Sequence, residues 1–347
     1  MPLSGEDRLL GWLRRRFDLP LLGDDAAVLP SPEERSGFAA TVDSQIEGVH
    51  YPPGLDPALL ARRLLAVNLS DLAAMGATPA FALLALSAAP GFDHRRFFLS
   101  FVPACQEAGV TLAGGDLASS PGGTVATLTL LGSRPPRGRW LGRAGAEPGQ
   151  DLWVGGTVGE SAAGRLLLAR GARAGGGPGG RIQVSLPDDF EGSAGLLAAA
   201  RRAVRRHLSP LPQLALGAWL GTQRAGAAMD VSDGLARDLP RLCRASGTGA
   251  ELIIEALPFA RRFTELCDRS DDDPVALGLA GGEDYVLLFT LPAGIEPPDP
   301  FQCRKIGRIT GRRSIVAIHL GSTHPLPAHG WDHLTKKEPP APESRGF

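Results

Sequence analysis

Apolar residues recur at helical spacing between residues 57 and 75, and this stretch carries the strongest pattern in the chain. The positions that would face a core are Leu60, Leu64, Val67 and Met75. Asp56 and Pro57 suit the start of a helix, since a carboxylate accepts hydrogen bonds from the first turn and proline fits the first helical position. Gly76 suits its end. Asn68 and Asp71 are three residues apart, so this helix would also present a carboxylate beside its apolar stripe.

Shorter apolar runs predict strands on both sides of this helix. In the first half they lie at 38–43, 80–89, 110–116 and 124–132, the third running into a glycine turn. In the second half we expect a strand and turn over 151–161, a strand end at the start of 229–239, a glycine–acid turn that leads into a strand over 281–289, and strands near 303–309 and 314–320. Further helices are expected at 5–17, at 93–108, after residue 161 and from residue 234. Because helices and strands alternate, we expect a mixed α/β or α+β fold.

The chain of 347 residues is longer than one compact core usually supports, so two domains are expected. Residues 134–150 are rich in proline, glycine and arginine and would connect the halves. We therefore predict a domain over 1–147, a domain over 148–335 and a disordered tail over 336–347. The glycine-rich stretch 171–181 is expected to be a loop, and the basic stretch 201–207 a solvated helix face.

Composition excludes several classes of function. A formal net charge of −1 gives no reason to expect nucleic-acid or anionic-membrane binding. No apolar run reaches transmembrane length, and the N-terminus lacks the order of a signal peptide. Four cysteines without a CxxC pair fit reduced thiols of a cytoplasmic protein and argue against a zinc site or a disulfide framework.

Lysine is confined to Lys305, Lys336 and Lys337, and no GxxxxGK[ST] phosphate loop occurs. If the protein handles ATP, metal ions, arginine and backbone N–H groups must hold the phosphates.

Carboxylates recur at predicted strand ends and glycine turns. They are Asp24, Asp25, Asp43, Asp116, Asp230, Asp233, Glu283 and Asp284, with Asp71 on the helix. Gathered in one place they would repel one another, and several Mg²⁺ ions that bridge phosphate oxygens would relieve this repulsion. Each motif alone also fits a plain structural role: Ser232 and Asp233 would cap a helix, His50 would be a hydrogen-bonded loop histidine, and Trp331 would pack.

Several motifs together resemble thiamine-monophosphate kinase, a family in the fold superfamily of aminoimidazole ribonucleotide synthetase and selenophosphate synthetase. They are GDDAAV (23–28), TVDSQIEGVHY (41–51), AVNLSDLAAMGATP (66–79), GGD (114–116), RAGA (143–146), DVSDGL (230–235), GGEDY (281–285) and GWDH (330–333). The resemblance implies a two-domain PurM-like fold, in which the N-terminal domain forms a dimeric β-barrel flanked by helices and the C-terminal domain is α/β. It implies ATP-dependent, Mg²⁺-assisted conversion of thiamine monophosphate to thiamine diphosphate by a cytoplasmic homodimer.

The resemblance also assigns roles by position. The metal ligands would be Asp25, Thr41, Asp43, Asp71, Asp116, Asp230 and Asp233. The nucleotide contacts would be Gly115, Asp116, Arg143 and Ser232. Contacts to thiamine monophosphate would come from His50, Glu283 and Trp331, the last by stacking on an aromatic, cationic ring. Because the attacking phosphate oxygen is already anionic, we expect no catalytic histidine base and no phosphoenzyme.

The sequence departs from the family pattern at Leu99 and Ser100, where Tyr-Gly is common, and at Val42 and Val286. Two other interpretations stay open at this stage. One is a superfamily relative that phosphorylates another acceptor. The other is a non-catalytic maturation factor with an ATP site, although such a factor commonly presents a C-terminal cysteine and the last cysteine here is Cys303.

Overall fold

The computed structural model describes residues 24–30, 37–134, 138–177 and 181–326, together with three helical positions near the N-terminus, Arg8, Gly11 and Arg16. The rest of the predicted helix 5–17, the tail 336–347 and Trp331 lie outside the described residues.

The first half of the chain forms a five-stranded sheet with two helices. The elements are β1 (Ala27–Pro30), β2 (Gly37–Ile46), α2 (Pro57–Ala74), β3 (Thr78–Ala88), α3 (His94–Glu107), β4 (Thr111–Ser119) and β5 (Val125–Ser133). The strand order is β1-β2-β5-β3-β4, antiparallel except for the β3–β4 pair. The apolar run at 80–89 is therefore an inner strand, as its composition predicts.

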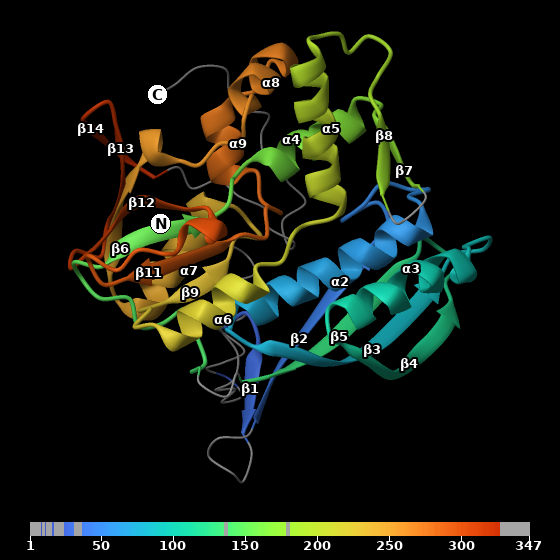
Figure 1. Ribbon diagram of the computed structural model, residues 1–347, viewed down its shortest axis with the longest axis horizontal. Helices are drawn as coiled ribbons and strands as arrows, with labels where there is room; N and C mark the ends of the chain where they lie inside the picture. The colour runs from blue at the N-terminus through green and yellow to red at the C-terminus, as the bar shows by residue number, and fades with distance from the viewer. Residues whose placement is uncertain are drawn as a thin grey trace.

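Helices α2 and α3 cover one face of this sheet and leave the other face open (Figure 1). Successive side chains of β3 point to opposite faces of the sheet. Ala82, Leu84 and Leu86 are buried under the helices, whereas Phe81 and Leu83 point to the open face. The large side chains that stay exposed on this open face are Leu29, Phe38, Val42, Phe81 and Leu83. A face of this kind is typical of a surface that binds another protein.

The second half forms a seven-stranded sheet and a hairpin. Its strands are β6 (Asp151–Gly155), β7 (Arg173–Gly176), β8 (Ile182–Ser185), β9 (Ala228–Asp230), β10 (Gly249–Ile253), β11 (Leu287–Leu291), β12 (Cys303–Thr310), β13 (Ile315–His319) and β14 (Ser322–Pro325). Its helices are α4 (Glu160–Ala169), α5 (Ala194–Leu208), α6 (Leu214–Thr222), α7 (Leu235–Ser246), α8 (Phe263–Ser270) and α9 (Pro274–Ala280), with short 3₁₀ turns η2 (Ile254–Ala256) and η3 (Asp299–Phe301). The order of the large sheet is β14-β13-β10-β12-β6-β11-β9.

This larger sheet is buried on both faces. Along β6, Leu152 and Val154 pack into the core that includes residues of α7, while Trp153 packs into the core that includes residues of α6. The sheets use residues 27–133 and 151–325, and the predicted domain boundary between residues 147 and 148 stays a prediction.

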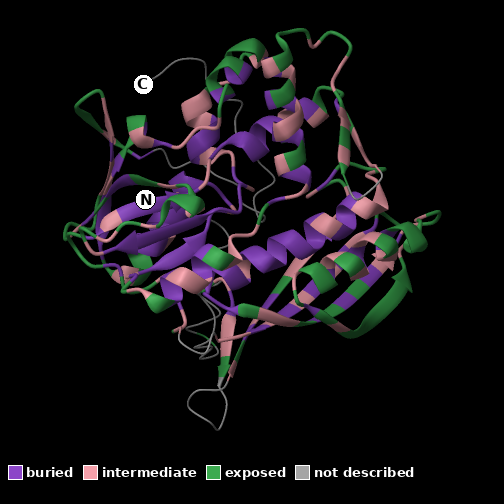
Figure 2. Ribbon diagram, in the orientation of Figure 1, coloured by how far each residue is buried: buried purple, intermediate pink, exposed green. Residues whose placement is uncertain are grey.

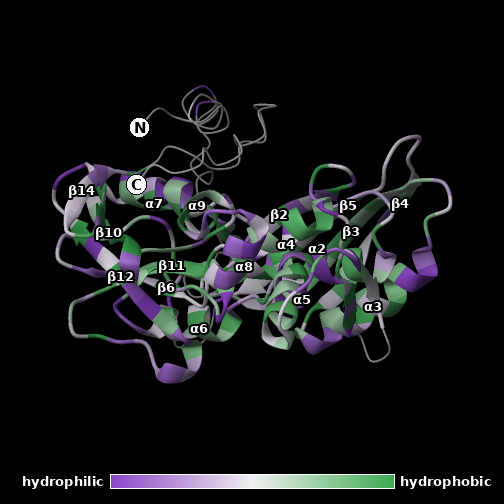
Figure 3. Ribbon diagram, turned by 90° about the horizontal axis from the view of Figure 1, so that it is seen from above, coloured by the Kyte–Doolittle hydropathy of each residue, from purple (hydrophilic) through white to green (hydrophobic). Residues whose placement is uncertain are grey.

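Helix α2 lies between the two sheets and is buried nearly all round (Figure 2). Seen from above, the sheets occupy opposite ends of the molecule, with α2, α4 and α5 between them (Figure 3). Asp56 caps α2 as predicted, accepting a hydrogen bond from the Ala58 N–H at 3.0 Å. Near the other end of α2, Gly217 of α6 approaches closely, since an added Cβ there would lie 2.0 Å from the Ala73 carbonyl oxygen. Among the described helices, none is long and apolar enough to cross a membrane.

Two local predictions for glycine-rich segments are wrong. Residues 173–176 of the glycine-rich stretch form β7, which pairs with β8, because the apolar residues Ala174 and Val184 of this hairpin pack against the α4–α5–α8 core. The GGD motif does not end its strand in a turn, since β4 continues through Asp116 to Ser119. Gly115 permits this, because β3 passes so close that a Cβ would lie 1.8 Å from the Leu84 carbonyl oxygen.

Candidate metal and phosphate site

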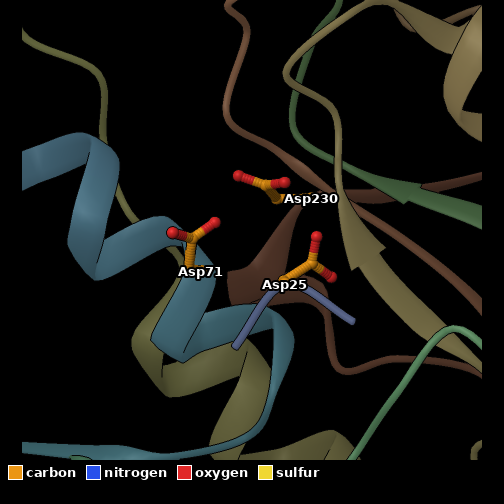
Figure 4. A group of neighbouring side chains, drawn as sticks. All are labelled: Asp25, Asp71 and Asp230. Carbon is orange, nitrogen blue, oxygen red and sulfur yellow. The ribbon is translucent and has the colours of Figure 1, made fainter. Parts of the chain in front are cut away.

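Three carboxylates from distant parts of the chain meet beside α2. Asp25 precedes β1, Asp71 lies in the last turn of α2, and Asp230 ends β9. One oxygen of each lies within 4.8 Å of the others, and the three side chains point toward a common space (Figure 4). Such a set of oxygen ligands suits Mg²⁺, which takes a few carboxylates and completes its shell with water or phosphate.

The electrostatics of this cluster favour a cation. Burial, followed by the charges of Asp43, Asp230 and Asp25, raises the pKa of Asp71 well above its usual value. Burial and the charge of Asp25 likewise raise the pKa of Asp230, and burial and neighbouring aspartates raise the pKa of Asp43 to about 6. The Oδ2 atom of Asp25 is buried and has no hydrogen-bond partner among the residues that the structure describes. Each of these features would be relieved by a bound divalent ion.

Neighbouring side chains orient the three carboxylates. Thr41 Oγ1 donates to Asp71 Oδ2 at 2.5 Å, and Ser70 Oγ donates to Asp230 Oδ2 at 2.7 Å. Arg143 Nη2 lies 2.6 Å from Asp25 Oδ1. The arginine therefore brings a fixed positive charge to the edge of the carboxylate group, where a phosphate would also bind.

Asp233 forms a second charged group at the start of α7. Arg241 Nη1 donates to Asp233 Oδ2 at 2.6 Å and to Asp238 Oδ1 at 3.0 Å. Burial and the charge of Asp233 raise the pKa of Asp238 to about 7. The alternative that Ser232 and Asp233 cap this helix is wrong, because Gly234 is the N-cap and no side chain hydrogen-bonds the cap.

The turns that carry DVSDGL and GGEDY lie side by side. The Glu283 N–H donates to the Ser232 carbonyl oxygen at 2.7 Å, and the Tyr285 N–H donates to the Val231 carbonyl oxygen at 2.9 Å. Glu283 and Tyr285 adopt positive φ values of 57° and 50°, a left-handed conformation that residues other than glycine seldom take. These bonds place the predicted substrate contact Glu283 next to the predicted nucleotide contact Ser232.

Comparisons with known proteins show which family this chain resembles. A family model described as "AIR synthase related protein, N-terminal domain" matches residues 23–133. The thiamine-monophosphate kinase of Salmonella typhimurium is 39% identical over 274 residues, covering 78% of this chain and 76% of the relative. That of Escherichia coli strain K12 is 35% identical over 337 residues, covering 92% of this chain and 93% of the relative. The chain belongs to the thiamine-monophosphate kinase family.

A solved structure, AaThiL complexed with AMPPCP and TMP, superposes with a TM-score of 0.81 at 26% identity and covers 96% of this chain and 99% of that chain. The mixed α/β, PurM-like fold expected from the sequence is thereby confirmed. The barrel shared between subunits stays a prediction.

Three of the residues predicted from the thiamine-monophosphate kinase resemblance lie outside the carboxylate group. Gly115 and Asp116 are on β4, an exposed edge strand, where Asp116 pairs in register with Ala85 of β3. His50 lies in the turn after β2, and its Nδ1 accepts a hydrogen bond from the Ile46 N–H at 3.0 Å. This contact agrees with the loop-histidine alternative and leaves a role in substrate binding untested.

Sequence reasoning missed two residues that touch the predicted thiamine-monophosphate kinase site, Arg63 and His207. Both are buried, and both contact Glu283. Arg63 carries a signal in the sequence, because it lies three residues after Leu60 and four before Val67, on the apolar stripe of the helix. His207 ends the basic stretch expected to be solvated, where the structure buries Ala203, Val204 and His207.

Proposed function

We propose that this protein transfers the γ-phosphoryl group of ATP to thiamine monophosphate and so forms thiamine diphosphate. The observation that carries the proposal is the meeting of Asp25, Asp71 and Asp230 within 4.8 Å, at positions that the family motifs assign to metal ligands. Relatives named thiamine-monophosphate kinase, and a related structure whose ligands are AMPPCP and TMP, support the same reaction.

Mg²⁺ would be held by Asp25, Asp71 and Asp230, and the site fits such an ion. Without a cation the carboxylates repel one another, and Asp25 Oδ2 has a buried lone pair without a donor among the described residues. Thr41, Asp43, Asp116 and Asp233 are proposed as further ligands from the resemblance. When bound, such ions neutralise phosphate charge and align the phosphoryl group.

The side chains of the protein would bind and orient the two substrates. Arg143, which already contacts Asp25 at 2.6 Å, would reach a phosphate oxygen of the nucleotide. Lys305 is the one lysine among the described residues and pairs with Asp151 at 2.7 Å, so arginine is the available phosphate-binding cation. Gly115 and Ser232 would contact the nucleotide, and His50, Glu283 and Trp331 thiamine monophosphate. No side chain needs to accept a proton from an attacking phosphate oxygen.

A homodimer is part of the proposal, and the open face of the five-stranded sheet supports it. Val42, Phe81 and Leu83 of this face are 61%, 42% and 46% exposed, which is unusual for the strands of one sheet. The edge strand β4 also offers unpaired backbone groups. A second copy that covers this face would place Gly115 and Asp116 at a subunit interface.

The protein is proposed to act in the cytoplasm as an enzyme of thiamine diphosphate biosynthesis. Its four cysteines are free, as expected for a reducing compartment.

Release of ADP by purified protein with ATP and Mg²⁺ tests the function. Thiamine monophosphate is compared with thiamine, with an aminoimidazole-pathway substrate and with no acceptor, and products are identified by mass. ADP release that depends on thiamine monophosphate, with thiamine diphosphate as product, is the expected result. ADP release without acceptor preference would refute the proposed acceptor while retaining an ATP site.

A further inference from the structure

Arg63 is a fully buried cation that joins three parts of the molecule. From α2 its Nε donates to Gln45 Oε1 of β2 at 2.8 Å. Its Nη1 donates to the carbonyl oxygen of His207 at the end of α5, and its Nη2 donates to Glu283 Oε1 in the 281–285 turn. Each nitrogen of the guanidinium group therefore has a different, fixed acceptor.

Burial of a guanidinium group is unfavourable unless its charge is matched, and Glu283 provides the match. The Glu283 side chain is 24% exposed while that of Arg63 is fully buried. The ion pair therefore has an inner member held by the protein and an outer member that a ligand can reach. An ion pair that only links α2 to the 281–285 turn would not require one of its two partners to be accessible to a ligand.

The other neighbours of Glu283 restrict the carboxylate further. Glu283 Oε2 lies 3.3 Å from His207 Nδ1, and that nitrogen lies 3.2 Å from Ser161 Oγ of α4. Burial lowers the pKa of His207 to about 3, so this imidazole is neutral at pH 7. Arg165 of α4 adds a positive charge at longer range. Arg63 is thus the cation in direct contact with the carboxylate.

We propose that Arg63 is a positioning residue that fixes the Glu283 carboxylate, in ionised form, for binding of thiamine monophosphate. This inference rests on the proposed function and adds a residue that the family motifs do not assign. The chemistry is complementary, because the thiamine ring system is cationic and a fixed carboxylate binds it without the entropic cost of ordering a flexible side chain. Arg63 holds the carboxylate through Nη2 alone, from a fully buried position, while its other two nitrogens are held by Gln45 and the His207 carbonyl oxygen.

Steady-state kinetics of four single variants and one double variant test the proposal. Arg63→Met is expected to raise KM for thiamine monophosphate by about tenfold or more, the range expected for loss of a charge-assisted contact, and to change KM for ATP less than about twofold. Arg63→Lys keeps the charge but loses the fork, so an intermediate increase is expected. Arg62→Met on the same helix is the matched control, because Arg62 is partly exposed, and wild-type constants are expected. In Glu283→Gln, adding Arg63→Met should raise KM little further.

The pH profile separates positioning from simple support of the fold. Burial alone would raise the pKa of Glu283, and Arg63, through its charge and its hydrogen bond, holds it below its usual value. Without Arg63 the carboxylate should protonate at higher pH, so the acidic limb of kcat/KM for thiamine monophosphate should move to higher pH. In Glu283→Gln this limb should be absent.

Three outcomes would overturn the inference. They are an unchanged KM for thiamine monophosphate in Arg63→Met, an equal rise of both KM values, and an additive effect in the Glu283→Gln background. If Arg63→Met fails to fold, Arg63→Lys alone and combined with Glu283→Gln provides the same comparison. If the wild-type protein does not use thiamine monophosphate at all, the proposed function itself is refuted, which the wild-type assay reveals before any variant is made.

Discussion

Asp71→Asn is expected to stabilise the metal-free protein while it abolishes activity. The substitution preserves shape, and the amide oxygen that it introduces would still accept the hydrogen bond from Thr41 Oγ1. It removes one of three carboxylates whose oxygens lie within 4.8 Å of one another. At an effective dielectric constant of about 20, two full charges at that separation repel by roughly 3–4 kcal/mol. Escape by protonation at pH 7 costs about 4 kcal/mol for a carboxyl group with an ordinary pKa. The wild-type protein either keeps both charges and bears the repulsion or protonates one carboxyl group, so its destabilisation is limited to the less costly of the two. For Asp71→Asn we therefore expect a gain of about 1–3 kcal/mol in the free energy of unfolding without metal.

Thermal or urea unfolding in EDTA and in MgCl₂ measures this gain, and the ADP-release assay measures turnover. Asp71→Asn should be more stable than the wild type in EDTA, should gain less from Mg²⁺, and should lose activity by about three orders of magnitude. Asp188→Asn is the matched control, because Asp188 is exposed and the substitution changes the net charge equally. Lower stability of Asp71→Asn in EDTA would refute the argument from charge repulsion. Near-normal turnover would refute the metal assignment.

The remaining predictions concern pH, packing and assembly. The pKa values of Asp43 and Asp238, raised to about 6 and about 7 from 3.8, mean that the folded state binds protons more tightly than the unfolded state. The stability that these groups contribute is therefore fully present below the ordinary pKa of 3.8 and is lost as pH rises through about 6 and about 7. The melting temperature in EDTA should therefore fall between about pH 4 and 7 relative to that of the Mg²⁺-bound protein, and parallel curves would contradict this. Gly217→Ala should lower the free energy of unfolding by about 2–3 kcal/mol, because its Cβ would overlap the backbone of α2, whereas Gly122→Ala, where nothing lies within 4 Å, should change it by less than about 0.5 kcal/mol; equal effects in urea unfolding would refute the packing argument. Leu83→Glu on the open sheet face should convert the dimer to monomers in sedimentation or light scattering, and a dimer of unchanged stability would place the interface elsewhere.

Local patterns predicted the elements well where capping and periodicity agree. Helix α2 begins at Pro57, as its cap predicts, and ends one residue before the predicted limit. The prediction of a loop over 171–181 was wrong. Its local composition indicates a loop, but a hairpin forms because Ala174 and Val184 pack on helices that are distant in sequence. Propensity is a weak guide where tertiary contacts are available.

The sequence predicted which residues belong to the candidate site, but it did not predict how those residues are arranged in space. Asp25, Asp71 and Asp116 all belong to acidic motifs of similar appearance, yet two of them meet beside α2 and the third lies on an exposed edge strand. The difference comes from the β3–β4 pairing, which carries Asp116 past the position where a turn was expected. Strand register of this kind depends on contacts between segments far apart in sequence, which local patterns do not encode.

Helix α2 carries one residue proposed to act on each substrate, Asp71 for the nucleotide and Arg63 for thiamine monophosphate. Arg63 and Asp71 are eight residues apart, so they are separated by about 12 Å along the axis and by roughly 80° around it. Asp71 thus faces the carboxylate group formed with β9, while Arg63 faces the turn that carries Glu283. Because side chains at that separation usually act independently, the proposed metal and phosphate end of the site and the proposed thiamine-binding end should be separately alterable by mutation. Their relative position is nevertheless fixed, since both are built on one helix that is packed between the two sheets. A phosphoryl transfer that depends on alignment rather than on a proton-accepting side chain requires a rigid separation of this kind.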